Sequence, residues 1–189
     1  MRTANPVDKT FRVLNQMVRD GVISRYAVAG AVGALNYLEP ITTRDVDILV
    51  PVEDLTPAKS GLVTLESIFS YLRTHGYGDI RDEGVMIEGW PVQFLPAASP
   101  LDTEGLDQAI ETEIEGIKIR VLRPEHLVAT SLKVGRPKDY LRIAAFFSDE
   151  QVDRAELASV FDRHDLWGAW SEYCRRTGTT DPASLRLRP

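Results

Sequence analysis

Two aspartates, Asp45 and Asp47, open a run of aliphatic and β-branched residues that is typical of a strand. Side chains two positions apart on a strand project from the same face, about 6.5–7 Å from each other. Two carboxylates in that arrangement can hold a hard cation such as Mg²⁺, which prefers carboxylates together with the phosphate oxygens of a substrate. The opposite face of the strand carries Val46, Ile48 and Val50, and we expect that face to be buried.

A glycine turn precedes the aspartate pair in the chain. Gly30 follows the apolar run 26–29 and opens a helix that the pattern predicts over 30–38. Glycine lets the main chain come close to a ligand there, and the first N–H groups of a helix attract anions. The pattern therefore favours a phosphate seat before the acidic strand. Two alternatives remain: Gly30 makes only a tight turn, or Asp45 and Asp47 are solvated or paired with Arg44.

A basic run follows later in the chain. Residues 118–142 contain seven basic and two acidic side chains, whereas residues 1–117 contain 9 basic and 18 acidic ones. An acidic front half with a basic patch behind it fits a metal–carboxylate site that faces a phosphate-binding surface. Lys138 and Arg142 share one helical face at i,i+4 spacing, and Asp139 and Arg142 can pair at i,i+3. An ordinary solvated helix face is the alternative.

The surrounding pattern predicts the elements that must position these groups. Helices are expected over 8–20, 30–38, 64–75, 101–110, 124–134, 137–148, 151–163 and 166–177. Strands are expected over 26–29, 45–50, 84–88 and 91–95, with one or two more within 111–122. This order predicts an α/β (α+β) fold, in which a small mixed sheet is flanked by helices and followed by a C-terminal helical bundle. We expect an α/β domain over 1–122, a helical region over 123–177 packed on it, and a flexible tail over 178–189.

Composition excludes several classes of protein. The chain has 189 residues, a net charge of −6 and 43% hydrophobic residues, which is ordinary for a globular domain. The single Cys174 excludes an internal disulfide framework and a cysteine-based zinc site, and the three histidines lack metal-ligand spacing. No run of about 18 apolar residues predicts a membrane span, and the N-terminus does not have the pattern of a secretory signal. We expect a cytoplasmic protein without membrane contact.

The turn and the acidic strand together resemble the nucleotidyltransferase superfamily with the DNA polymerase β-type fold. The matching residues are Ala29-Gly30-Ala31, then Asp45-Val46-Asp47-Ile48, and the preceding Thr43 matches a pattern that is common in the bacterial toxin-like branch. Three later segments resemble bacterial abortive-infection toxins of the AbiEii type and their uncharacterised relatives. They are PVQFLPA (91–97), the stretch 120–147 and FDRHDL (161–166), and the most specific part runs from Lys133 to Asp139. The resemblance covers roughly residues 20–170.

The resemblance implies a two-metal transfer of a nucleotide from an NTP to an acceptor. The acceptor would be an RNA, such as a tRNA end, or a protein side chain, and the chain would act as the toxin of a toxin–antitoxin pair with a cognate antitoxin. The resemblance also makes Asp45, Asp47 and Gln93 the candidate catalytic residues, with Mg²⁺ held by the two aspartates. The candidate nucleotide-binding residues are Gly30, Ala31, Gly33, Lys133, Arg136 and Lys138.

The chain departs from the family pattern in two places. Gln93 stands where a third carboxylate is expected, and a glutamine amide is a poor base. Glu88 would replace that carboxylate if the turn before Trp90 folds back, and Ala31 offers no hydroxyl for a phosphate. Two further interpretations follow from these departures: a catalytically impaired nucleotide- or RNA-binding module of the same fold, and an accessory protein that binds a partner chain.

Overall fold

A seven-stranded mixed sheet forms the centre of the computed structural model, which describes residues 6–38, 45–57, 63–81 and 84–179. The strand order is β5-β6-β7-β2-β1-β9-β8. Its strands are β1 (Ala27–Val28), β2 (Val46–Val50), β5 (Ile80–Arg81), β6 (Gly84–Ile87), β7 (Trp90–Pro96), β8 (Ile110–Ile114) and β9 (Ile117–Val121). Thr43, Arg44 and the expected tail from residue 180 lie outside the described residues.

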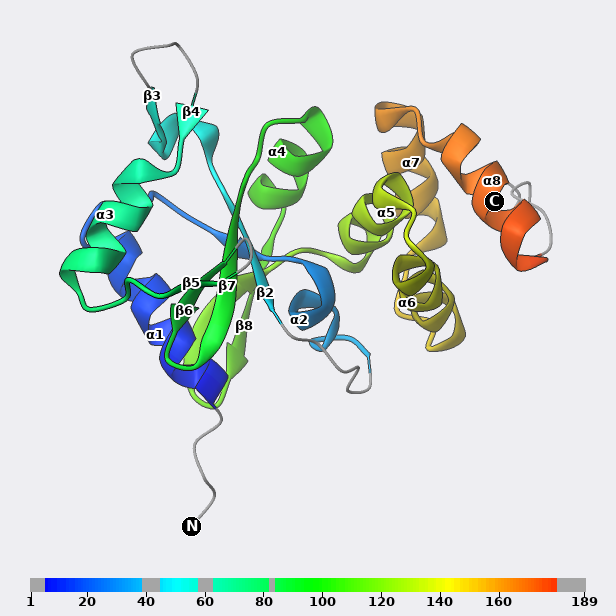
Figure 1. Ribbon diagram of the computed structural model, residues 1–189. Coiled ribbons are helices and arrows are strands. Elements are labelled where there is room, and N and C mark those ends of the chain that lie inside the picture. The colour runs from blue at the N-terminus through cyan, green and yellow to red at the C-terminus, as the bar shows by residue number, and fades with distance from the viewer. Residues whose placement is uncertain (1–5, 39–44, 58–62, 82–83, 180–189) are drawn as a thin grey trace.

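Eight α-helices surround or follow the sheet within the described part of the chain. They are α1 (Pro6–Arg19), α2 (Gly30–Ala34), α3 (Glu66–Thr74), α4 (Pro100–Asp107), α5 (Pro124–Val134), α6 (Pro137–Ser148), α7 (Arg154–His164) and α8 (Trp167–Thr177). Figure 1 shows α1 and α3 on one side of the sheet and the helices α5 to α8 gathered on the other. The fold is therefore the expected α/β arrangement with a C-terminal group of helices.

Strand alternation divides the core into two layers. On β2, the side chains of Val46, Ile48 and Val50 are buried in the cluster that also holds Phe11 of α1, as the pattern predicted. Leu49 faces the other way and packs in the cluster of the C-terminal helices. Because strand residues alternate between faces, Asp47 lies on the side of Leu49.

The structure differs from the predicted elements at a helix end, at a hairpin turn and in its shortest elements. The helix expected over 30–38 ends at Ala34, because the Asn36 and Tyr37 N–H groups bond three residues back, to the Gly33 carbonyl at 3.3 Å and the Ala34 carbonyl at 2.9 Å. The β6–β7 hairpin turns on Glu88 and Gly89, both at positive φ, instead of on Gly89 and Trp90. The 3₁₀ helix Val52–Asp54 and the strands β3 (Thr56–Pro57), β4 (Val63–Thr64) and β5 escaped prediction, since elements of two or three residues carry no periodicity.

The C-terminal helices pack onto the sheet through one continuous core. Leu127 of α5 belongs to the same buried cluster as Ala27 of β1 and Leu49 of β2. Trp170 of α8 stacks on Tyr173 and lies 5.7 Å from the ring of Phe161, measured between ring centroids. No helix in the described part of the chain is both long and apolar enough to span a bilayer.

Candidate functional site

Gly30 and Asp47 lie in direct contact at the end of β1. A Cβ atom placed on residue 30 would fall 1.9 Å from Oδ2 of Asp47, and Gly30 has a φ of +58°. The antiparallel pairing of β1 with β2 brings them together, since the Ala29 N–H donates to the Asp47 carbonyl at 2.9 Å. Only glycine fits this position, because any side chain would collide with Asp47 and because a positive φ is unfavourable for other residues. The carboxylate therefore rests on bare main chain.

Gln93 completes this group from the neighbouring strand. β7 runs parallel to β2 and places Gln93 directly beside Asp47. The Gln93 Nε2 atom donates a hydrogen bond to Oδ2 of Asp45 at 3.3 Å. Gln93 is thus hydrogen-bonded to Asp45 through its side chain and lies beside Asp47 through the strand pairing. The three candidate catalytic residues therefore form one cluster.

The charge of Asp47 is unfavourable in this environment. Burial raises its pKa above the ordinary value, and the nearby negative charge of Asp45 raises it further. Three cations oppose this shift: Arg142, Lys138 and Arg136. All three come from α6 or the residue immediately before it. The N-terminal half of α6 and the residue before it therefore direct positive charge at Asp47, which connects the basic run to the acidic strand.

Arg142 is the member of this group that sequence reasoning missed as a site residue. Only 9% of it is exposed, and its guanidinium donates to Asp139 at 3.3 Å and to Ser131 at 3.4 Å. Asp139 also accepts from the Arg136 N–H at 3.1 Å, which fixes the start of α6. The pair of Asp139 and Arg142 is therefore buried, not the solvated surface pair of the alternative interpretation. Its i+4 spacing from Lys138 was the available signal.

Two predicted nucleotide-binding residues are engaged elsewhere. Lys133 Nζ donates to the Ser99 hydroxyl at 3.0 Å, at the residue that caps α4. Gly33 is buried, and a Cβ there would lie 2.8 Å from the Val28 carbonyl oxygen. Its N–H bonds to the Ala29 carbonyl at 2.9 Å. Close packing accounts for a glycine at position 33, whereas Ala31, which is half-buried in the first turn of α2, remains beside Gly30.

Glu88 does not replace the third carboxylate in this structure. Its side chain accepts a hydrogen bond from the Tyr77 hydroxyl at 2.7 Å and lies 3.9 Å from Lys9 Nζ. Lys9 belongs to α1, so the Glu88 carboxylate turns toward the helices on the far face of the sheet. The hairpin that carries Glu88 continues directly from β6 into β7, which leaves Gln93 as the β7 residue nearest the two aspartates.

The donor set of the site fits Mg²⁺ bound largely through a substrate. The described residues contain no group of three or more His, Cys, Asp or Glu side chains placed to hold a metal. Two carboxylates and one amide are present instead, with one carboxylate lying against a main-chain bend. Mg²⁺ binds proteins through one or two carboxylates and completes its shell with water and substrate phosphates. The residues therefore fit that ion in the company of a phosphate.

Comparison with known proteins identifies the fold. Over 88% of this chain and 93% of the other, it is similar to a nucleotidyltransferase-like antigen of Paracoccidioides brasiliensis, with a TM-score of 0.53 and 16% identity. Over 90% of this chain and 98% of the other, it is similar to the antibiotic-resistance factor ANT(2'')-Ia, with a TM-score of 0.53 and 12% identity. No protein-family model and no curated protein matches the sequence. The fold is therefore nucleotidyltransferase-like.

Proposed function

We propose that this chain is a Mg²⁺-dependent nucleotidyltransferase that moves a nucleotide from an NTP to an RNA or protein acceptor. The observation that carries the proposal is the contact between the Asp47 carboxylate and the bare Gly30 turn. It joins a metal-binding group to a main-chain bend at which phosphates can approach closely. The nucleotidyltransferase-like fold supports it as well.

Each residue of the site has a role in this proposal. Asp45 and Asp47 would hold Mg²⁺, and the Gln93 amide would fix the orientation of Asp45. When bound, the metal supplies positive charge to the phosphates and to the attacking oxygen. The main chain of Gly30 and Ala31 would lie along the phosphates.

The two parts of the chain would divide the work. The α/β domain up to residue 122 would provide the acidic strand and the glycine turn, and the helical region over 123–177 would provide the cations. Arg136 and Lys138 are exposed and act electrostatically on Asp47, so we assign them to the triphosphate. Lys133 stays a weaker candidate because it would first have to leave Ser99.

Transfer of label from an α-³²P NTP onto total RNA or total protein tests the activity. The expected result is labelled RNA or protein with the wild-type chain and Mg²⁺, and none with Asp45→Asn or Asp47→Asn. Both substitutions keep the shape of the side chain and remove its charge, so binding surfaces are otherwise preserved. Undiminished transfer by both variants would overturn the metal assignment.

A second candidate keeps the nucleotide site without the transfer, and one observation favours it. Gln93, where a base is expected, is bonded to Asp45 through its Nε2 atom and cannot accept a proton from an acceptor. Such a binding module would gain thermal stability from NTP and Mg²⁺ but transfer no label. An accessory protein that binds only a partner chain would show neither effect.

The toxin role is a further part of the proposal. It rests on the resemblance of the segment from Lys133 to Asp139 to AbiEii-type toxins, and it would place the protein in the cytoplasm with a cognate antitoxin. Induced expression in a bacterium tests it: growth should stop with the wild-type chain and continue with Asp47→Asn. Equal growth in both cultures would remove this role without affecting the enzymatic proposal.

A further inference from the structure

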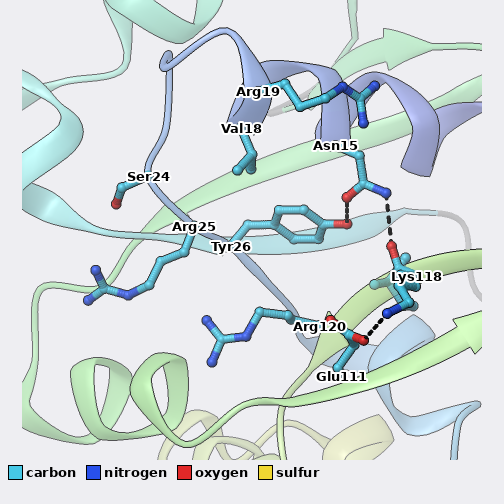
Figure 2. A pocket seen from close by; sticks show the side chains of 10 residues that line it. Asn15, Val18, Arg19, Ser24, Arg25, Tyr26, Glu111, Lys118 and Arg120 are labelled. Atoms are coloured by element: carbon cyan, nitrogen blue, oxygen red, sulfur yellow. Dashed lines mark hydrogen bonds and ion pairs between the residues drawn. The ribbon is translucent and has the colours of Figure 1, made fainter.

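A basic groove lies between α1 and the β8–β9 hairpin. It consists of two adjoining hollows of about 330 and 350 Å³, which share Asn15, Arg19 and Lys118. We call it the α1–β9 groove, and Figure 2 shows the first of its two hollows. Its polar and charged lining consists of Arg12, Asn15, Arg19, Ser24, Arg25, Tyr26, Glu111, Lys118 and Arg120.

The groove is separate from the aspartate pair. Its wall is α1, which covers the face of the sheet opposite Asp47. Tyr26 in its floor precedes β1, whereas the aspartates lie beside the other end of that strand, where Ala29 pairs with Asp47. No residue of the groove belongs to the proposed catalytic site.

Positive charge dominates the groove in a chain of net charge −6. Five cations line it, against the single carboxylate of Glu111. Lys118 pairs with Glu111 at 2.8 Å, and Arg25 pairs with two carboxylates outside the lining, Asp107 at 2.9 Å and Glu53 at 3.4 Å. The other three cations have no carboxylate within ion-pair distance among the described residues: Arg12, Arg19 and Arg120.

Local bonds already occupy the neutral polar groups of the groove. The Asn15 amide donates to the Lys118 carbonyl at 2.8 Å and accepts from the Tyr26 hydroxyl at 2.9 Å, which Figure 2 shows as dashed lines. The Ser24 hydroxyl donates to Asp54 at 2.8 Å. The floor beneath is apolar, formed by Val18, Ile119 and the ring of Tyr26. The groove therefore presents cationic guanidinium groups with few neutral groups left to read a sequence.

We propose that the α1–β9 groove is a second binding site, which holds the phosphate backbone of a single-stranded RNA segment. Arginine forks match phosphate oxygens, and contacts to a backbone position a nucleic acid without reading its sequence. Arg12 and Arg19 lie seven residues apart on α1, about 10.5 Å along the helix, so they contact successive points of an extended polyanion. An acidic polypeptide fits this groove less well than an RNA backbone does. Its charges are irregularly spaced, and its main chain needs hydrogen-bond partners, of which the groove has few among its neutral groups.

Fluorescence anisotropy with a labelled oligouridylate strand tests this site directly. The variant is Arg12→Glu/Arg19→Glu, since both side chains are exposed and the fold should tolerate the change. Its matched control is Arg175→Glu/Arg176→Glu, which makes the same change in net charge on α8, at the other end of the molecule. Circular dichroism and thermal unfolding verify that both variants are folded.

The expected result is that the groove variant binds the strand roughly tenfold or more weakly than wild type, while the control variant changes little. The slope of log affinity against log salt should fall in magnitude by about 1.4, because each single-strand phosphate contact contributes about 0.7. Equal RNA binding by both variants, or no RNA binding by wild type, would overturn the proposal. So would displacement of the RNA by poly-glutamate at an equal concentration of charge, which would point to an acidic protein partner.

Variants of the two sites test RNA binding in the groove separately from nucleotidyl transfer. Asp45→Asn/Asp47→Asn should keep RNA binding, and the groove variant should keep the stabilisation by NTP and Mg²⁺. If the groove variant loses RNA binding but keeps the stabilisation by NTP and Mg²⁺, the result supports the groove as an RNA-binding site even when no nucleotidyl transfer is found.

Discussion

Oδ2 of Asp47 occupies the space in which a side chain on Gly30 would begin. The metal-binding candidate and the phosphate-seat candidate are therefore one unit, because a change at residue 30 must displace the carboxylate at residue 47. Asp45, Gln93 and the cations of α6 are arranged around this contact.

Gly30→Ala should therefore destroy the site. The new methyl group meets the Asp47 carboxylate and also strains a backbone with a φ of +58°, so we expect destabilisation of at least about 1 kcal/mol and loss of nucleotide binding. Gly21→Ala is the matched control, since Gly21 has a φ of +72° and nothing within 4 Å of the point where its methyl group would lie. Urea unfolding and NTP-induced stabilisation measure both effects. Retained NTP binding in Gly30→Ala would contradict the proposed geometry.

Asp47→Asn should stabilise the ligand-free protein. Burial and the charge of Asp45 raise the pKa of Asp47, so the ionised form is disfavoured in the folded state and costs stability at neutral pH. Removing the charge should increase the free energy of unfolding by roughly 0.5–2 kcal/mol, a gain that is common when an unfavourable group at a functional site is replaced. Urea unfolding measures it, with Glu113→Gln on exposed β8 as a control expected to stay within about 0.5 kcal/mol. A less stable Asp47→Asn would contradict this view of the charge.

Gln93→Asp should make stability depend on Mg²⁺. A third carboxylate beside Asp45 and Asp47 adds like-charge repulsion, which a bound divalent cation would relieve. We expect a lower melting temperature than wild type in EDTA and recovery of most of the loss with Mg²⁺. Gln93→Asn, which is neutral and of the same size as aspartate, is the control and should respond little to the metal. An equal response of both variants would place the metal elsewhere.

Glu104 should make the protein sensitive to acid. Arg163 lowers its pKa most strongly, and His164 and His126 add to this, which brings the pKa to about 2 from the ordinary value of 4.5. A lowered carboxyl pKa stabilises the fold above pH 4.5, and this stability disappears as the pH falls toward 2. Burial of His126 lowers its pKa below 6.5, so protonating it also costs stability as the pH falls.

Glu104→Gln measures this contribution. It should cost about 1–3 kcal/mol at neutral pH and flatten the acid limb of the stability curve, because the glutamine no longer titrates. Glu172→Gln is the control: its pKa is also lowered, by Arg175 and Arg176, but these groups are exposed and screened by water, so the substitution should change stability little and leave the acid limb as in wild type. Acid limbs of equal steepness in wild type and Glu104→Gln would show that Glu104 is not the source.

Local spacing was enough to predict the acidic strand, the glycine turn and the strand that carries Gln93. Alternating residues fix which face of β2 is buried, and that face determines where Asp47 points. The i+4 spacing places Arg142 on the helical face of Lys138, but its burial against Ser131 depends on how α6 docks on α5, which the sequence of α6 alone does not contain. The same holds for Glu104, which joins His126 and His164 across separations of 22 and 60 residues.

Thermal unfolding with an NTP, with and without Mg²⁺, tests the central claim most directly. Aspartates beside a bare main-chain turn should hold the triphosphate through the metal, so NTP should raise the melting temperature of wild type only when Mg²⁺ is present. The increase should vanish in both Asp45→Asn and Asp47→Asn. No increase in wild type, or the same increase in EDTA and in both variants, would contradict the account.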